Sequence, residues 1–166
     1  MLPLSATDQL GRGTMNGNSR FLPDSKGAVV PFQTQRRIEF RDTDAAGIVH
    51  FSAFFPMMEA AEHEMLRSIG VSILPHANDA PRLSWPRVSA SCDYLAAARF
   101  EDILEISVTV GRIGESSIRY EFSFFRDETE IARGVMTAVC CELLAGGGLK
   151  KASIPDEIRE KLHQVG

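Results

Sequence analysis

The 166-residue chain has little cysteine, and none of its three cysteines forms a Cys-x-x-Cys pair. Cys92, Cys140 and Cys141 are too few for a thiolate metal site, and an odd number does not suit a disulfide framework. The four histidines are scattered, with no His-x-x-x-His pair to place two imidazoles on one helical face. We therefore predict that the cysteines are small packing residues and that the protein holds no metal.

An excess of positive charge and long apolar runs are also absent. The net charge is -4, which gives no electrostatic reason to expect nucleic acid or an anionic membrane as a partner. No run approaches the roughly 18 consecutive apolar residues that a membrane span needs, and residues 1–8 lack the charged and apolar regions of a signal peptide. The sequence therefore predicts a cytoplasmic protein with no nucleic-acid or membrane partner.

Length and composition predict one globular domain. The chain has 44% hydrophobic and 24% charged residues, which is ordinary for a globular protein of this size. Residues 1–30 are rich in Gly, Ser, Asn, Asp and Pro and show no sustained periodicity, so we expect a disordered leader there. Residues 31–166 would then form the single domain.

One long helical pattern begins near Phe51. Apolar residues recur there at spacings of three and four, which predicts a helix with one buried face. Ser52 is the expected N-cap, Gly70 is the expected C-terminal stop, and Pro56 near the start predicts an irregular first turn. The residues of the apolar face are Phe51, Phe54, Phe55, Met58, Ala61, Met65 and Ile69.

Most of the remaining chain alternates between apolar and polar residues, as strands do. A short strand at 35–41, with Ile38 and Phe40 on one face, precedes the helix, and a short terminal helix is expected at 153–162. The last strand is apolar on both faces, which favours a central place in the sheet. The strands expected after a loop at 72–86 are 88–94, 104–110, 118–124 and 131–144.

This order of elements predicts an α+β fold in which a curved five-stranded antiparallel sheet wraps around one long central helix. A single helix cannot cover all the apolar surface of such a sheet or protect its edges. Pairing of two sheets, edge to edge or face to face, would do so. We therefore expect a homodimer or a homotetramer.

The strongest candidate for chemistry is the pair Asp42 and Asp44, which precedes Gly47 and the helix start. A carboxylate beside free helix N–H groups suits acyl transfer, because the carboxylate attacks a carbonyl or activates water while the N–H groups hold the oxyanion. The alternative is a turn and capping device without catalytic function. The stretch lacks the further acidic positions of a calcium loop.

Three other residues near this pair have a catalytic and a structural interpretation. His50 is a candidate general base or a packing residue, and Glu59 is a candidate acid that we expect to be partly buried on the face of Phe55 and Leu66. Glu59 could equally make a structural hydrogen bond. Ser52 lacks the Gly-x-Ser-x-Gly motif of a serine hydrolase, so we interpret it as a cap.

The stretches 38–51 and 58–70, with Asp93 to Leu104, the 112–117 turn and 154–159, resemble hotdog-fold acyl-CoA thioesterases of the 4-hydroxybenzoyl-CoA thioesterase type. The resemblance covers about residues 35–160. It implies that Asp44 is the catalytic carboxylate and that Asp42 and Gly47 support it. It also implies that the backbone N–H groups of Phe51 and His50 polarise the thioester carbonyl, and that no cofactor is required.

The resemblance also implies a substrate and its contacts. Phe51 and Phe54 stand where many members carry His or Tyr, so we expect an apolar pocket for an aryl or medium acyl group. The turn with Arg112, Ser116 and Ser117 would contact coenzyme A, although an acyl carrier protein thioester is an alternative substrate. A binding module without catalysis and an enoyl-thioester hydratase or dehydratase remain alternative functions.

Overall fold

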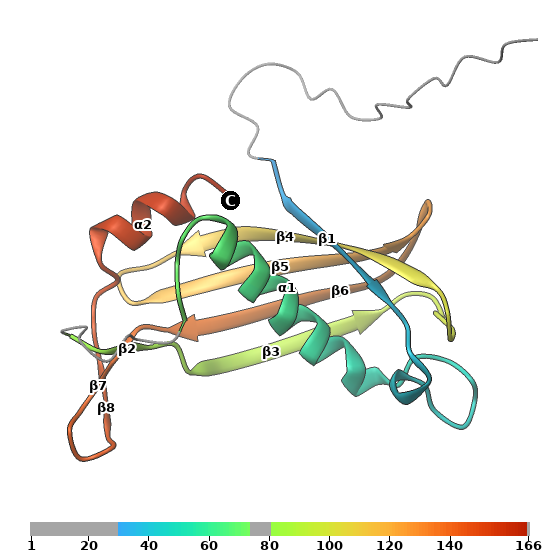
Figure 1. Cartoon of the computed structure of the whole chain (residues 1–166), viewed down its shortest axis with the longest axis horizontal. Coiled ribbons are helices and arrows are strands. Elements are labelled where there is room, and N and C mark those ends of the chain that lie inside the picture. Colours follow the sequence, from blue (N-terminus) through green and yellow to red (C-terminus); the bar gives the residue numbers. More distant parts are fainter. Residues whose placement is uncertain (1–29, 74–80, 166) are drawn as a thin grey trace, which may run out of the picture.

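Five antiparallel strands form the main sheet, in the spatial order β1-β4-β5-β6-β3. The structure is a computed structural model that describes residues 30–73 and 81–165, so nearly all of the predicted leader lies outside the described residues. Helix α1 (Phe54–Ser68) crosses one face of the sheet (Figure 1). This arrangement confirms the predicted α+β fold. The strands are β1 (Phe32–Arg37), β3 (Arg87–Tyr94), β4 (Ile103–Ile113), β5 (Ser117–Arg126) and β6 (Thr129–Val139).

Helix α1 packs against the sheet through a stripe of buried residues and ends at a glycine. The N–H of Gly70 donates to Arg67 O at 3.0 Å, and the N–H of Val71 donates to Leu66 O at 2.8 Å. Gly70 has φ +68, which a glycine adopts without strain, so the predicted stop is confirmed. Neither described helix is long and apolar enough to cross a membrane. The buried residues of α1 are Phe54, Met57, Met58, Ala61, Glu62, Met65 and Leu66.

The start of the helix differs from the prediction. A 3-10 turn, η2 (Phe51–Ala53), precedes α1, so Phe51 lies outside the buried face and is 59% exposed. The prediction that Ser52 caps the helix is wrong, because the ring of His50 accepts the N–H of Ser52 instead. Pro56 is the third residue of α1, where an N–H has no intrahelical acceptor, so the proline removes no helical bond.

Strands β4, β5 and β6 supply the sheet side of the core. In β4 and β5 the buried residues alternate with less buried ones, as predicted. Strand β6 was predicted to be central and buried on both faces: it does lie between β5 and β3, but its fully buried positions are mainly on one face, and Val135 and Val139 on the other face are only partly buried. Gly134 of β6 faces Phe122 of β5 and lies directly below Met58 of α1. A Cβ atom at Gly134 would overlap the Met58 sulfur, so this glycine allows the helix to approach the sheet closely.

Two strand boundaries were predicted wrongly. The first strand starts at Phe32 and ends at Arg37, and Phe40 lies in the 3-10 turn η1 (Phe40–Asp42), where it is 79% exposed. Ile38 is fully buried, as expected. The predicted strand 131–144 divides after Val139, and its second part joins another sheet.

That second sheet has the order β2-β7-β8 and was not predicted. Its strands are β2 (Leu83–Ser84), β7 (Cys141–Leu143) and β8 (Leu149–Lys151), and the glycines of 145–148 connect β7 to β8. Helix α2 (Asp156–Leu162) follows and is shorter than predicted. Its Arg159 donates to the carbonyls of Gly114 and Glu115, which fixes α2 to the β4–β5 turn.

The cysteines are packing residues, as predicted. Cys140 and Cys141 are buried, Cys92 is partly buried, and all three are free thiols. Burial raises the pKa of Cys140 to about 11 and also raises the pKa of Cys92. The reactive thiolate form is therefore scarce at neutral pH.

Candidate active site

Asp44 lies in a closed loop between two paired residues, Thr43 and Val49. Within the loop, Asp44 N–H donates to Ile48 O, and Gly47 N–H donates to Asp44 O, each at 2.9 Å. Gly47 has φ +72, so a residue with a Cβ atom would be strained at this turn. The loop therefore holds Asp44 in a defined position, and Gly47 supplies the backbone conformation of its turn. The supporting role of Gly47 in catalysis stays a prediction.

The Asp44 carboxylate is only partly engaged. Its Oδ1 accepts the N–H of Ala46 at 2.8 Å, and Oδ2 has no hydrogen-bond partner among the described residues. The residue is half-buried. One oxygen is thus fixed by the loop, and the other is available for a ligand.

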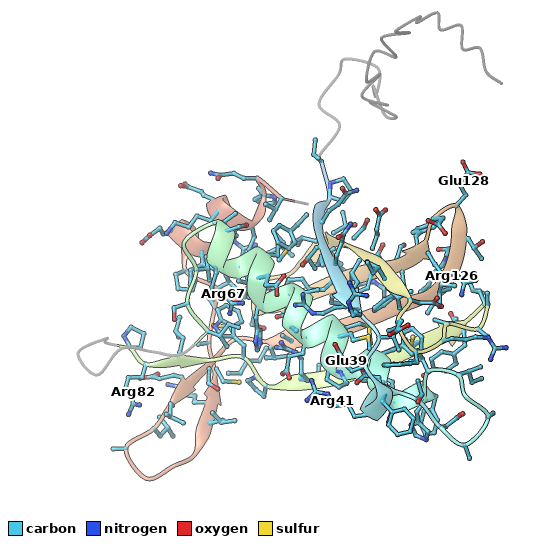
Figure 2. All side chains as sticks on the ribbon, turned by 45° about the vertical axis from the view of Figure 1, so that its right-hand side comes forward. Glu39, Arg41, Arg67, Arg82, Arg126 and Glu128 are labelled. Atoms are coloured by element: carbon cyan, nitrogen blue, oxygen red, sulfur yellow. The ribbon has the colours of Figure 1, made fainter. Side chains whose placement is uncertain are left out.

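Asp42 makes structural hydrogen bonds instead. Its Oδ2 accepts the N–H of Glu39 at 2.9 Å, and its carbonyl accepts the N–H of His50 at 2.8 Å. Glu39 and Arg41 lie near the N-terminal end of α1, whereas Arg67 lies toward the other end (Figure 2). The two hydrogen bonds that Asp42 accepts, from Glu39 N–H and His50 N–H, favour a positioning role for Asp42. They also show that the His50 N–H is already donated, so that part of the predicted carbonyl contact is wrong.

The side chain of His50 is fixed by its neighbour Ser52. The Ser52 N–H donates to His50 Nδ1 at 3.3 Å, and Ser52 Oγ lies 2.7 Å from the same nitrogen. A nitrogen that accepts a main-chain N–H carries no proton, so the neutral imidazole has its proton on Nε2. His50 therefore closes the start of turn η2, and this contact favours the structural interpretation over a general base.

A cleft of about 440 Å³ joins the Asp44 loop to turn η2 and to the end of strand β3. Its walls are mainly apolar and aromatic, which is typical of a site for a small organic group. Phe54 is 3% exposed, and its ring contacts Tyr94 at 5.4 Å and Phe124 at 5.2 Å between centroids. The lining residues are Asp44, Ile48, Val49, Phe51, Phe54, Tyr94, Leu95, Ala96, Ala97 and Ala98.

Residues 95–98 form one wall of this cleft, and the segment 95–102 to which they belong is held by a charged pair. Asp102 Oδ2 accepts Arg126 Nη1 at 2.6 Å and the N–H of Arg99 at 2.8 Å. Partial burial alone would raise the pKa of Asp102, but the hydrogen bonds from Arg126 and Arg99 lower it. Val49 N–H donates to Ala98 O at 2.9 Å, so the wall is bonded to the Asp44 loop.

The predicted residues Arg112, Ser116 and Ser117 are not part of this cleft. They lie at the far end of β4 and at the β4–β5 turn, and the eleven residues of β4 span about 35 Å. Ser116 is buried, and its carbonyl accepts the N–H of Cys140 at 2.7 Å. The fold of the chain therefore does not bring these residues to Asp44.

The buried acid of the helix is Glu62, and the prediction that Glu59 is partly buried is wrong. Glu59 is exposed, whereas Glu62 is 1% exposed and accepts Arg87 Nη2 at 2.7 Å. Burial raises the pKa of Glu62 to about 7, although Arg87 lowers it. Glu62 lies four residues after Met58 and three before Met65, so its place on the apolar stripe was visible in the sequence.

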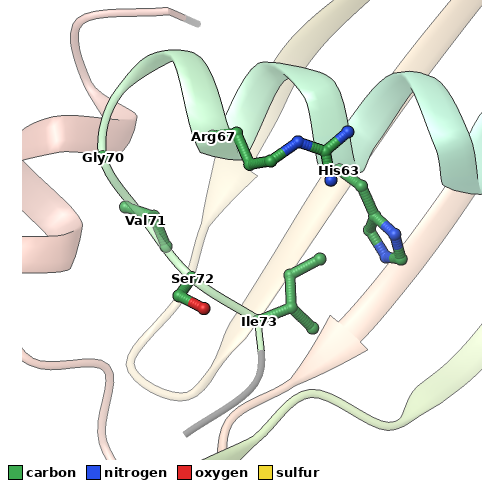
Figure 3. A pocket seen from close by; sticks show the side chains of 6 residues that line it. All are labelled: His63, Arg67, Gly70, Val71, Ser72 and Ile73. Atoms are coloured by element: carbon green, nitrogen blue, oxygen red, sulfur yellow. The ribbon is translucent and has the colours of Figure 1, made fainter. Parts of the chain in front are cut away.

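A second cavity, of about 490 Å³, lies at the other end of α1. Arg67 and His63 project from the helix, and Ile73 faces them from the following segment (Figure 3). Burial lowers the pKa of His63. No carboxylate lines this cavity within the described residues, so the cleft at Asp44 is the better candidate for acyl transfer. No described cluster of three or more His, Cys, Asp or Glu could hold a metal ion.

A model of the thioesterase-like superfamily matches residues 38–162. The chain belongs to this superfamily. A provisionally named esterase from Aquifex aeolicus is 30% identical over 134 residues, which are 80% of this chain and 98% of the relative. A 1,4-dihydroxy-2-naphthoyl-CoA hydrolase from Nostoc punctiforme is 28% identical over 127 residues, 76% of this chain and 83% of the relative.

The structural comparison agrees with this family. The crystal structure of a 1,4-dihydroxy-2-naphthoyl-CoA thioesterase from Synechocystis matches with a TM-score of 0.70 and 26% identity. The match covers 80% of this chain and 96% of that structure. The hotdog fold and the resemblance to thioesterases that the sequence indicated are therefore confirmed.

Sequence reasoning missed three parts of the site. Tyr94 was placed on a strand without a role, and the pair of Asp102 and Arg126 was not considered. Tyr94 and Asp102 lie in the stretch 93–104 that carries part of the family resemblance, but their contacts with turn η2 and with Arg126 arise only through the fold. The sequence did place Asp44 and Phe51 near each other, and both line the cleft.

Proposed function

We propose that the protein hydrolyses acyl-CoA thioesters to the free acid and coenzyme A in the cleft at Asp44. The observation that carries this proposal is that Asp44 and Phe51 line one cleft in a member of the thioesterase-like superfamily. Asp44 supplies a carboxylate oxygen that has no partner among the described residues, and the Phe51 N–H lies at the start of a helical turn, where no intrahelical acceptor exists. Together they match the needs of acyl transfer.

Two routes are open to Asp44. In the first, the carboxylate attacks the thioester carbonyl, the C–S bond breaks to release the coenzyme A thiolate, and water hydrolyses the resulting anhydride. In the second, Asp44 accepts a proton from water while the water oxygen attacks the carbonyl, and the C–S bond breaks from the tetrahedral intermediate. In both routes the Phe51 N–H donates to the carbonyl oxygen as negative charge develops on it.

The acyl group that fits is aromatic or of medium length. The cleft is lined by Phe51, Phe54 and Tyr94 and by Leu95 and three consecutive alanines, so it offers apolar surface and three aromatic rings. Aromatic rings pack well against such walls. The named relatives that act on 1,4-dihydroxy-2-naphthoyl-CoA support an aryl substrate, and an acyl carrier protein thioester remains the alternative to coenzyme A.

A thiol-release assay over aryl, short, medium and long acyl-CoAs tests this function. We expect release with aryl and medium chains and much slower release with long chains. Binding of these thioesters without release would favour a binding module instead. Conversion of an enoyl-CoA with its C–S bond intact would favour a hydratase or dehydratase.

We also propose that the protein is a homo-oligomer that pairs through strand β3. This strand is an edge of the main sheet, and an unpaired edge with apolar side chains is a ready surface for another strand. Val88 is 62% exposed, and Leu95, just after the strand, is 52% exposed. A homodimer is the smallest assembly that covers this edge.

The cytoplasmic location that the sequence indicated remains a prediction.

Light scattering at micromolar concentration should give the mass of a dimer or tetramer. The variant Val88→Lys should shift the protein toward the monomer, because it places a charge on the proposed interface. Leu149→Lys is the matched control, since Leu149 is 50% exposed on β8, a strand of the second sheet that does not belong to the β3 edge of the main sheet. A monomeric wild type, or equal effects of both variants, would contradict pairing through β3.

A further inference from the structure

The first turn before helix α1 is fixed at nearly every main-chain polar group. The N–H of His50 donates to Asp42 O, and the carbonyl of His50 accepts the N–H of Ala53 at 2.9 Å. The N–H of Ser52 donates to His50 Nδ1, and the carbonyl of Ser52 accepts the N–H of Phe54. Within the described residues, the N–H of Phe51 is the group of this turn that has no acceptor.

The direction of the Phe51 N–H follows from peptide geometry. The N–H and the preceding C=O of a trans peptide point in opposite directions. The His50 carbonyl points forward into the turn, toward Ala53, so the Phe51 N–H points backward, out of the start of the helix. That is where a ligand carbonyl would meet it.

One side chain from another part of the fold holds this turn. Tyr94 Oη donates to the carbonyl of Phe51 at 3.1 Å, across 43 positions of sequence. Tyr94 is the last residue of β3, and its ring packs on the buried ring of Phe54. Partial burial raises the pKa of Tyr94, so its hydroxyl keeps the proton that it donates.

We propose that Tyr94 is a positioning residue for the carbonyl-polarising N–H of Phe51. The hydroxyl fixes the peptide that follows Phe51, while the Asp42 and His50 contacts fix the peptides before it, so the free N–H keeps its direction. The ring of Tyr94 has a second effect, because it forms part of the cleft wall that receives the acyl group. This inference rests on the proposed hydrolysis of acyl-CoA thioesters.

The hydroxyl and the ring can be tested separately. Tyr94→Phe keeps the ring and removes the hydrogen bond, so kcat should fall about fivefold, the effect of one hydrogen bond, with KM changed less than twofold. Tyr94→Leu removes the ring as well, and should raise KM for an aryl acyl-CoA more than for a medium aliphatic one. Tyr120→Phe is the matched control, since it removes the only other tyrosine hydroxyl from a buried position outside the cleft.

A spectroscopic measurement separates positioning from a general loss of structure. With an aryl-CoA bound to Asp44→Asn, the thioester C=O stretch should lie at lower frequency than in water, because the Phe51 N–H polarises it. Adding Tyr94→Phe should reverse part of that shift. An unchanged kcat in Tyr94→Phe, or an unchanged stretch in the double variant, would overturn the role of Tyr94. Failure of the wild type to hydrolyse any thioester would instead overturn the proposed function.

Discussion

Asp44→Asn should lower turnover by at least about 100-fold, the scale expected when a catalytic carboxylate loses its charge. The amide keeps the size of the side chain and can still accept the N–H of Ala46, so the loop should stay folded. Binding of the thioester should therefore survive. The Phe51 N–H would still polarise the carbonyl, which leaves slow hydrolysis in place of none. Steady-state kinetics with the best acyl-CoA of the substrate panel measures both effects.

Asp42→Asn is the matched control, because it makes the same chemical change two residues away. Its carboxylate accepts the N–H of Glu39, which an amide oxygen can also do, and its carbonyl contact with His50 is unaffected by the substitution. We expect a smaller loss of turnover and a lower melting temperature. If Asp42→Asn has no turnover while Asp44→Asn remains active, Asp42 is the catalytic carboxylate and Asp44 the positioning residue. If both variants have wild-type turnover, Asp42 and Asp44 stabilise the turn and have no catalytic function.

The elements with strong periodicity were predicted from the sequence alone. Apolar residues recur every three or four positions in helix α1 and every second position in strands β4 and β5. Each of these elements buries the face that carries them. The second sheet was not predicted, because β2 has two residues and β7 and β8 have three each. Strands this short carry no measurable period, and their pairing depends on contacts far along the chain.

The site was predicted where chemistry is local and missed where the fold assembles it. Asp44, Gly47 and Phe51 are near each other in sequence, so one stretch contained the loop and the turn. Tyr94 reaches the same turn from the end of β3, and Arg112 is carried away by the length of β4. Separation in sequence predicts neither that Tyr94 lies near turn η2 nor that Arg112 lies far from Asp44, because the pairing of the strands determines which strand ends lie close together.

Glu62 and Arg87 form an ion pair that joins helix α1 to strand β3 inside the protein. Arg87 Nη2 donates to Glu62 Oε2 at 2.7 Å, and Arg87 Nη1 donates to Trp85 O at 3.0 Å. Arg87 Nε is buried and has no partner among the described residues. Glu59 raises the pKa of Glu62 further. Burial raises the pKa of Tyr120, and the charge of Glu62 raises it further.

The pKa of Glu62 links this pair to pH. A carboxyl that titrates near 7 in the folded chain and near 4.5 when unfolded stabilises the fold most below about pH 4.5. That contribution is lost as pH rises to about 7, and a shift of this size corresponds to about 3 kcal/mol. Above pH 7 the folded protein holds a buried carboxylate, and Arg87 is the cation that compensates it.

Arg87→Met should therefore destabilise the protein by about 3–5 kcal/mol at pH 8, because it leaves a buried charge without its partner. At pH 5 the loss should be smaller, since Glu62 is then protonated in both proteins. The double variant Glu62→Leu/Arg87→Met is the control: it replaces the pair with apolar side chains and should recover most of the loss at pH 8. Chemical denaturation at pH 5 and pH 8 measures the free energies of unfolding of the wild type, Arg87→Met and the double variant. If Arg87→Met costs the same at pH 5 and pH 8, or if the double variant is no more stable than Arg87→Met, charge compensation does not explain the pair.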